Sequence, residues 1–253
     1  LPEFLLFISF GAFDKPPWEC YDTWGKSCGA WNWMETTAAV LIPAYKPDQR
    51  MLILIDALKA RGFLQLIVVD DGGGEHYAPL FQRAAEAGAQ VLVHPVNRGK
   101  GAALKTGLKH ILATGPCPVV TADADGQHAP GDVLRIARKL GEAPDALVLG
   151  VRDKSRMPAR SKFGNTLTCW TLGAVSGLWI DDTQTGLRGL TQAALEAFSE
   201  LPGDRYEYET GVLLYARREK MRVEQIVIET IYIDDNRGSS FQVLRDSVRI
   251  YGM

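Results

Sequence analysis

The chain has 253 residues, of which 46% are hydrophobic and 23% charged, with 28 basic against 30 acidic side chains. This composition excludes a disordered, collagen-like, coiled-coil or disulfide-scaffold protein, and the length fits one large domain or two small ones. The net charge of −2 provides no general field for nucleic acid, so we expect no nucleic-acid partner. The four cysteines form no CxxC pair, which is typical of free thiols in a reducing compartment.

Residues 1–33 lack the periodicity of the rest of the chain and hold four of its six tryptophans. Their apolar run, 4–13, has no basic leader and no small-residue cleavage site, so it is a poor signal peptide. We hypothesise that the native chain starts at Met34 and that 1–33 is an N-terminal extension derived from upstream translation. A natively expressed protein whose mass includes residues before Met34 would contradict this hypothesis.

Strands and helices are predicted to alternate from residue 38 onward. The apolar, β-rich runs that predict strands are 38–43, 64–70, 89–95, 117–123 and 145–151, and the helical periods between them are 49–61, 76–87, 100–113 and 130–140. Continuous apolar strands separated by helices of this length are typical of a parallel sheet that is buried on both faces. The fold class is therefore α/β, with a mainly parallel central sheet flanked by helices.

The pattern becomes irregular after residue 181. It predicts helices near 191–199 and 207–218, a strand over 223–233 and an amphipathic helix over 241–251. The longest run without a charge, 163–180, has 18 residues but contains three Gly, three Thr, an Asn and a Ser. It is too polar to cross a bilayer, which requires about 20 apolar residues, so we expect a buried or interfacial helix. The main domain is assigned to 34–235, and 236–253 to a C-terminal amphipathic segment.

Charged side chains gather where the predicted strands end. In an open α/β sheet, ligands bind beyond the carboxyl ends of parallel strands, and the N-terminus of a following helix favours anions. An acidic crevice of this kind suits a metal-bound phosphate ester. The charged residues in question are Asp70, Asp71, Arg98, Lys100, Asp123 and Asp125. The motifs GxxxxGK[ST], GxGxxG, GxSxG and HExxH are absent, which argues against P-loop enzymes, dinucleotide dehydrogenases, serine hydrolases and zinc proteases.

The strongest local signal is Asp123-Ala124-Asp125. Carboxylates at i and i+2 of an extended segment lie on one side and can hold a hard divalent cation, with Gln127 as a third oxygen ligand. Taken alone, the motif also fits an ordinary polar turn, but its place opposite a second acidic strand end favours the metal. Asp70 and Asp71 are similarly ambiguous, because Asp-Gly is a common turn and Asp caps helices.

Three further side chains have alternative explanations. We expect His94 to be a hydrogen-bonded residue of a strand end rather than a base. Arg98 and Lys100 precede a helix N-terminus, so they are candidates for binding phosphate, although a solvated loop fits them equally well.

The segments LIPAYKP, IVVDDG, HPVNRGKGAALKTG, TADADGQH, DTQTGLRG and RYEYE occur in this order. Together they resemble a family 2 glycosyltransferase with the GT-A fold, most closely the polyprenyl-phosphate (dolichyl-phosphate-like) sugar synthases. The resemblance extends from about residue 38 to residue 252. It implies an inverting enzyme that uses Mg²⁺ or Mn²⁺ to move a hexose from a nucleotide-diphosphate sugar to a polyprenyl phosphate. It also implies a location at the cytoplasmic face of the membrane, in peripheral contact with lipid and with a possible membrane-protein partner.

The resemblance implies roles for individual residues. The base pocket would be lined by Pro43, Tyr45 and Asp70, with Asp71 nearby, and the DxD pair on ribose and metal would be Asp123 and Asp125, with Gln127 as a further metal ligand. Arg98 and Lys100 would assist the departing diphosphate, and Arg152 and Arg160 would hold the acceptor phosphate. Asp182, Gln184 and Arg188 would lie across the sugar site, with Glu207 or Glu209 as an acid near the acceptor. Independently, residues 152–162 hold five cations and one acid just after a strand, which also fits a basic loop facing an anionic membrane.

Two departures from the family pattern are present. Gly73 stands where the family usually has Ser, and Ser240 stands where it usually has a His that contacts ligand phosphates.

Other functions remain open at this point. Transfer to a saccharide hydroxyl in cell-surface polysaccharide synthesis would need a carboxylate base, for which Asp182 or Glu209 is the candidate. A sugar nucleotidyltransferase would have a glycine-rich basic loop after its first strand, where this chain has PAYKP. A non-catalytic nucleotide-sugar binding protein would tolerate loss of the DxD carboxylates, and this chain keeps both.

Overall fold

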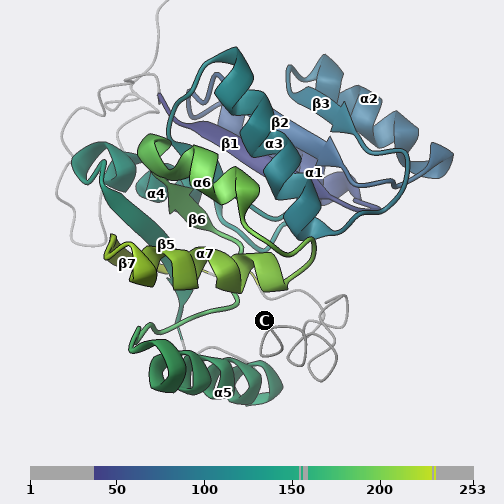
Figure 1. The fold of residues 1–253 in the computed structure, drawn as a ribbon. Coiled ribbons are helices and arrows are strands. Elements are labelled where there is room, and N and C mark those ends of the chain that lie inside the picture. The colour runs from purple at the N-terminus through teal and green to yellow at the C-terminus, as the bar shows by residue number, and fades with distance from the viewer. Residues whose placement is uncertain (1–36, 154, 156–158, 230, 232–253) are drawn as a thin grey trace, which may run out of the picture. The chain divides into compact units, whose positions relative to one another are not determined.

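A computed structural model describes residues 37–153, 155, 159–229 and 231, all within one compact unit that spans 35–253 (Figure 1). The predicted N-terminal extension, 1–33, and the predicted C-terminal segment, 236–253, lie outside the described residues.

The centre of the unit is a seven-stranded sheet with the order β3-β2-β1-β4-β6-β5-β7. Its neighbours pair in parallel except at β6, which runs antiparallel to both β4 and β5. The strands are β1 (Ala39–Ala44), β2 (Leu66–Asp70), β3 (Gln90–Val93), β4 (Val119–Thr121), β5 (Ala146–Arg152), β6 (Arg188–Leu190) and β7 (Arg222–Ile228). The mainly parallel sheet is therefore confirmed, whereas β6 was not predicted and β7 ends earlier than expected.

Helices cover both faces of the sheet, and each face has its own core. Alternate residues of β1 point to opposite sides, so Val40 and Ile42 join one core while Ala39 and Leu41 join the other. The first core packs under α1 (Gln49–Lys59), α2 (Ala78–Glu86) and α4 (Pro130–Glu142), and the second under α3 (Lys100–Thr114), α5 (Ala159–Ser176), α6 (Leu195–Glu200) and α7 (Glu207–Arg218). Burial on both faces explains why the central strands read as continuous apolar runs.

Short 3₁₀ turns, η1 (Glu75–Tyr77) and η2 (Gln192–Ala194), lead into α2 and α6. The uncharged run 163–180 lies mostly in α5, which ends where Gly177 adopts a φ of 72°. In the part of the chain that the structure describes, no helix has the length and apolarity needed to cross a bilayer.

Candidate active site

The predicted base-pocket residues meet at neighbouring strand ends. The parallel register of β1 and β2 sets Pro43 beside Val69 and Ala44 beside Asp70. Tyr45 follows β1 with 49% of its surface exposed, whereas the Asp70 side chain is buried and accepts a 2.7 Å hydrogen bond from the Gly73 N–H. Burial raises the pKa of Asp70. An exposed ring beside a buried carboxyl group is an arrangement that can accommodate a planar polar ligand.

Asp71 organises the loop that leads into α3. Its Oδ1 lies 2.8 Å from His94 Nδ1 and accepts the Arg98 N–H at 2.9 Å. Its Oδ2 accepts hydrogen bonds from Asn97 Nδ2 at 2.9 Å and from the Gly99 N–H at 2.8 Å. Both carboxylate oxygens of Asp71 therefore have hydrogen-bond partners within the chain. The expectation that His94 is a hydrogen-bonded histidine is confirmed.

Asp71→Asn is expected to lower the free energy of unfolding by about 2 kcal/mol, because an amide NH₂ would face N–H donors that now share a carboxylate. Urea denaturation of the two proteins measures this difference. Asp56→Asn on the exposed face of α1 is the control, and we expect it to change stability by less than about 0.5 kcal/mol. Equal stability of Asp71→Asn and the wild type would contradict the role assigned to Asp71.

Lys100 joins two carboxylates from distant parts of the chain. From the first residue of α3, its Nζ lies 2.6 Å from Asp123 Oδ1, which follows β4, and 3.0 Å from Glu209 Oε1 in α7. The second oxygen of Asp123 lies 3.3 Å from His128 Nε2. Gly186 packs against the same carboxylate, where a Cβ would overlap it. We call Lys100, Asp123 and Glu209 the lysine cluster.

Electrostatics in the lysine cluster follow from burial and charge. Burial alone would lower the pKa of the Lys100 ammonium, but the charges of Asp123 and Glu209 raise it above its ordinary value. Burial alone would raise the pKa of Asp123, yet the Lys100 charge and the His128 contact hold it well below its usual range. Both groups are therefore ionised at neutral pH.

Asp125 lies beside the lysine cluster, where burial and the Asp123 carboxylate oppose its ionisation. Its Oδ1 accepts the Gln127 N–H at 2.9 Å. Burial, and then the neighbouring Asp123 carboxylate, raise the pKa of Asp125. A divalent cation between Asp123 and Asp125 would relieve this repulsion, and carboxylate and amide oxygens are the ligands that such ions prefer.

The donor set fits a metal that a substrate helps to hold. Among the described residues, no group of three His, Cys, Asp or Glu side chains is arranged as a metal centre. Mg²⁺ is commonly held by one or two carboxylates together with substrate phosphates. Asp123 and Asp125 match that pattern, with Gln127 close by as the predicted third ligand.

A second ion pair lies at the end of β5. Arg152 Nε donates to Asp182 Oδ2 at 2.6 Å, and Arg152 Nη2 donates to Asp182 Oδ1 at 3.0 Å. The Asp182 side chain is fully buried, and its Oδ1 also accepts the Gln184 N–H at 3.0 Å. This two-point contact fixes the plane of the guanidinium. Arg160 falls in the first turn of α5, and its side chain lies outside the described part of the structure.

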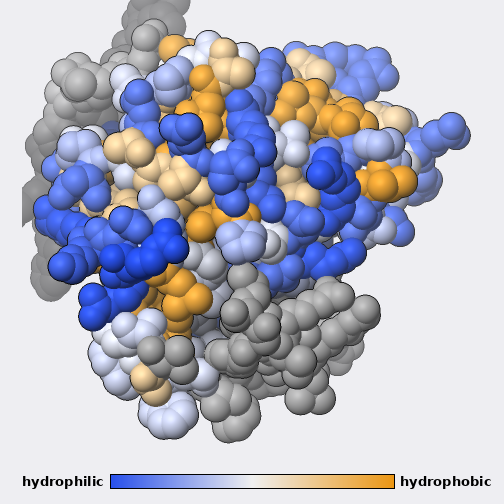
Figure 2. All heavy atoms as spheres, viewed as in Figure 1, coloured by the Kyte–Doolittle hydropathy of each residue, from blue (hydrophilic) through white to orange (hydrophobic). Residues whose placement is uncertain are grey.

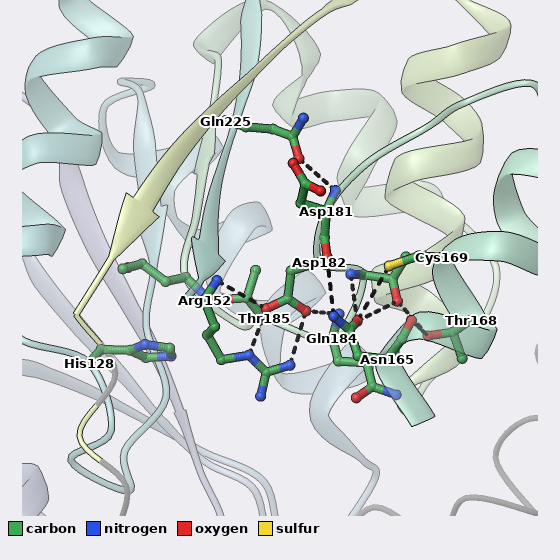
Figure 3. Close-up of polar contacts among 12 residues, drawn as sticks. His128, Arg152, Asn165, Thr168, Cys169, Asp181, Asp182, Gln184, Thr185 and Gln225 are labelled. Carbon is green, nitrogen blue, oxygen red and sulfur yellow. Dashed lines mark hydrogen bonds and ion pairs between the residues drawn. The ribbon is translucent and has the colours of Figure 1, made fainter. Parts of the chain in front are cut away.

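Asn165 of α5 holds the loop on both sides of Asp182 (Figure 3). Its Nδ2 donates to the Asp181 carbonyl at 3.2 Å, and its Oδ1 accepts the Thr183 N–H at 3.2 Å. The Cys169 thiol, one turn further along the helix, lies 3.5 Å from the same oxygen. The side chain of Asn165 is buried, so these bonds form away from water. Asn165 therefore positions the carboxylate that in turn orients Arg152.

Asn165→Leu is expected to lower the free energy of unfolding by about 2 kcal/mol, because it leaves the Thr183 N–H and the Asp181 carbonyl without their partner. Chemical denaturation measures the loss. Thr166→Ala, one residue away on the exposed side of α5, is the matched control and should be close to neutral. A Leu variant as stable as this control would show that the clamp contributes nothing.

Other predicted residues occupy distinct places. Arg188 is buried, and its guanidinium donates to the main-chain carbonyls of Thr183, Thr185 and Glu209. In this structure Arg188 therefore stabilises the backbone of the site. The side chain of Glu207 accepts the N–H groups of Asp204 and Arg205 at 3.2 Å, which identifies Glu209 as the acid that points into the site. The hydrogen bond from Lys105 lowers the pKa of Asp204, and the charge of Arg98 contributes to the same shift.

Sequence reasoning missed two site residues. His128 is buried against Asp123, and its Nδ1 finds no partner among the described residues. The signal was its position, three residues after Asp125 at a strand end. Asn165 could have been found in the sequence as a polar residue on the same helical face as Cys169 and Leu172.

Comparisons with known proteins identify the family of the chain. The model of glycosyl transferase family 2 matches residues 39–195. An uncharacterized protein of Methanocaldococcus jannaschii is 31% identical over 211 residues, covering 81% of this chain and 86% of its own. The UDP-N-acetylglucosamine–dolichyl-phosphate N-acetylglucosaminyltransferase of Methanococcus voltae is 29% identical, with 81% and 90% covered. The human dolichyl-phosphate beta-glucosyltransferase is 26% identical, with 82% and 71% covered.

Among solved structures, the chain is similar to glucosyl-3-phosphoglycerate synthase from Mycobacterium tuberculosis, solved with Mn²⁺, UDP-glucose and phosphoglyceric acid. The TM-score is 0.61 at 22% identity, and the match covers 86% of this chain and 80% of the other. This likeness shows a shared fold and confirms the predicted fold class.

Proposed function

The chain belongs to glycosyltransferase family 2, and from this premise we propose that it moves a hexose from a nucleotide-diphosphate sugar to a polyprenyl phosphate of the dolichyl type. The names of two relatives, which record transfer to dolichyl phosphate, support this acceptor. The same proposal puts the protein at the inner face of the membrane that holds the lipid.

The donor would bind at the carboxyl ends of β1, β2 and β4. Asp70 and Tyr45 would receive the base, and Asp123, Asp125 and Gln127 would hold Mg²⁺ or Mn²⁺ together with the diphosphate. When bound, the cation neutralises the diphosphate and stabilises it as a leaving group. Lys100, anchored by Asp123 and Glu209, keeps the carboxylates in place while the donor enters. The similar synthase, which was crystallised with Mn²⁺ and UDP-glucose, supports this proposal.

One observation favours a phosphate over a hydroxyl acceptor: both carboxylates that could act as a base are held by cations. Asp182 is bound at two points by Arg152, and Glu209 is bound by Lys100. Both carboxylates are thus engaged in ion pairs with side chains of the protein itself. A phosphate oxygen is already anionic near neutral pH, so it needs positioning rather than a strong base. Arg152 would provide that positioning, with Arg160 as the second proposed contact.

Transfer of labelled sugar from UDP-, GDP- and dTDP-hexoses to a short polyprenyl phosphate tests the proposal. We expect label in the organic phase with Mg²⁺ or Mn²⁺, and none with EDTA. Donor binding without lipid product, together with transfer to a saccharide, would move the acceptor to a hydroxyl. In that case Glu209→Gln should lower turnover by about a hundredfold or more. If the protein neither binds a donor nor transfers sugar, that result would contradict the enzymatic proposal as a whole.

A further inference from the structure

The outer side of α5 carries exposed aromatic side chains. In Figure 1 the helix lies below α7. Its buried side is formed by Cys169 and Leu172. On the opposite side Trp170 is 62% exposed. Trp179, which follows the helix and is 65% exposed, lays its ring over Gly173, where a Cβ would collide with it. Because positions i and i+3 are neighbours on a helix, the two indole rings lie on adjacent parts of one surface.

This surface is uncharged over a long stretch. No charged residue occurs between 163 and 180. Figure 2 shows pale spheres over α5, in contrast to the strong blue of the charged helices above it. Tryptophan combines a large apolar ring with one N–H donor and is enriched where membrane meets water. Two such rings held outward in water indicate an interaction surface.

Basic residues adjoin the uncharged stretch. Directly before it in the sequence, residues 154–162 hold four cations, in addition to Arg152, which pairs with Asp182. After it, the exposed Arg217 of α7 donates from Nε to the Ser176 carbonyl at 3.0 Å, and so lies at the C-terminal end of α5. An uncharged surface that exposes two tryptophans and adjoins basic residues complements a bilayer whose headgroups are anionic.

We propose that Trp170, Trp179 and the outer side of α5 form a docking surface for an anionic lipid bilayer, here called the lipid-facing surface. This inference rests on the proposed function and adds the element by which the enzyme reaches its lipid. The inner side of α5 carries Asn165, which positions the Asp182 loop. One helix therefore joins the bilayer surface to the guanidinium that receives the acceptor phosphate.

Co-sedimentation of the full chain with vesicles, in the absence of any sugar donor, tests the inference. We expect the wild type to bind phosphatidylcholine–phosphatidylglycerol vesicles more tightly than pure phosphatidylcholine, with binding that weakens as salt is added. Trp170→Ser/Trp179→Ser should lower partitioning by about tenfold or more. The matched control is Ile53→Ser/Leu64→Ser, which removes two exposed apolar side chains elsewhere and should bind like the wild type.

A second readout separates this inference from the proposed function. With a short, water-soluble polyprenyl phosphate and no vesicles, the tryptophan variant should transfer sugar as fast as the wild type. If neither protein transfers sugar, the proposed function fails while the vesicle result still stands. Wild-type partitioning by a correctly folded Trp170→Ser/Trp179→Ser variant would overturn the lipid-facing surface. So would a wild-type dimer that ignores vesicles and becomes monomeric in the variant, since a second copy would then cover the face.

Discussion

Asp125→Asn should abolish sugar transfer and at the same time stabilise the fold. Turnover is expected to fall by about a thousandfold, because Asp125 is one of the two carboxylates proposed to hold the divalent cation that would neutralise the leaving diphosphate. Stability is expected to rise because burial and the Asp123 charge raise the pKa of Asp125, so the folded protein holds an unfavourable charge at neutral pH. The Gln127 N–H can still donate to the amide oxygen, so the loop should keep its shape.

The difference in stability between Asp125→Asn and the wild type depends on pH. Since the folded pKa of Asp125 lies above the unfolded value of about 3.9, ionisation begins to destabilise the fold as pH rises through that value. The destabilisation is complete above the folded pKa. Asn has no such penalty, so the stability gap between variant and wild type should widen across this interval and then stay constant.

Thermal unfolding at several pH values, alongside the transfer assay, measures both effects. The exposed Asp145→Asn serves as the charge-matched control and should change neither. An Asp125→Asn enzyme as active as the wild type would remove the metal from the proposal.

Lys100→Met should destabilise the protein by about 3–5 kcal/mol, since it leaves Asp123 and Glu209 in the site without the cation between them. The loss depends on pH in a known direction. The stabilisation from the lowered pKa of Asp123 is present above about pH 3.9 and disappears as pH falls further. The stabilisation from the raised pKa of Lys100 is present below about pH 10.4 and disappears as pH rises through the folded value. The gap between the two proteins is therefore largest between these limits.

Denaturant titration measures the Lys100 effect, and two variants control it. Lys105→Met, in the same helix, removes a lysine whose partner Asp204 is 62% exposed, and it should cost about 1 kcal/mol or less. Lys100→Met/Glu209→Gln should regain part of the stability lost by Lys100→Met alone, because one of the two stranded charges is gone. A double variant that is less stable than Lys100→Met would contradict the lysine cluster as described.

The strands that carry the site were predictable because their burial on both faces leaves long apolar runs in the sequence. β6 was not, since a strand of three residues that includes a buried arginine has no measurable period. Arg188 is an example, because the sequence does not distinguish an arginine that binds a ligand from one that donates to three main-chain carbonyls.

The carboxylates of the site were predictable for a different reason. Asp123 and Asp125 stand close together in the chain, so their spacing carries information. The contact of Lys100 with Glu209 joins residues far apart in sequence, and only the packing of α3 against α7 creates it. Asp71 was predictable as a strand-end acid, but its partners lie in a loop whose shape the sequence does not specify.

The position of β6 also affects how the protein folds during its synthesis. β5 pairs with β6 and β7, both of which follow it in the chain, and β4 is linked to β5 only through β6. A growing polypeptide that has left the ribosome only as far as β5 therefore cannot complete its sheet. One side of β4 and one side of β5 would present open hydrogen-bonding groups until Arg188–Leu190 emerges, and the other side of β5 until Arg222–Ile228 emerges. During synthesis this interval is the period in which the nascent protein is most exposed to aggregation and most dependent on chaperones.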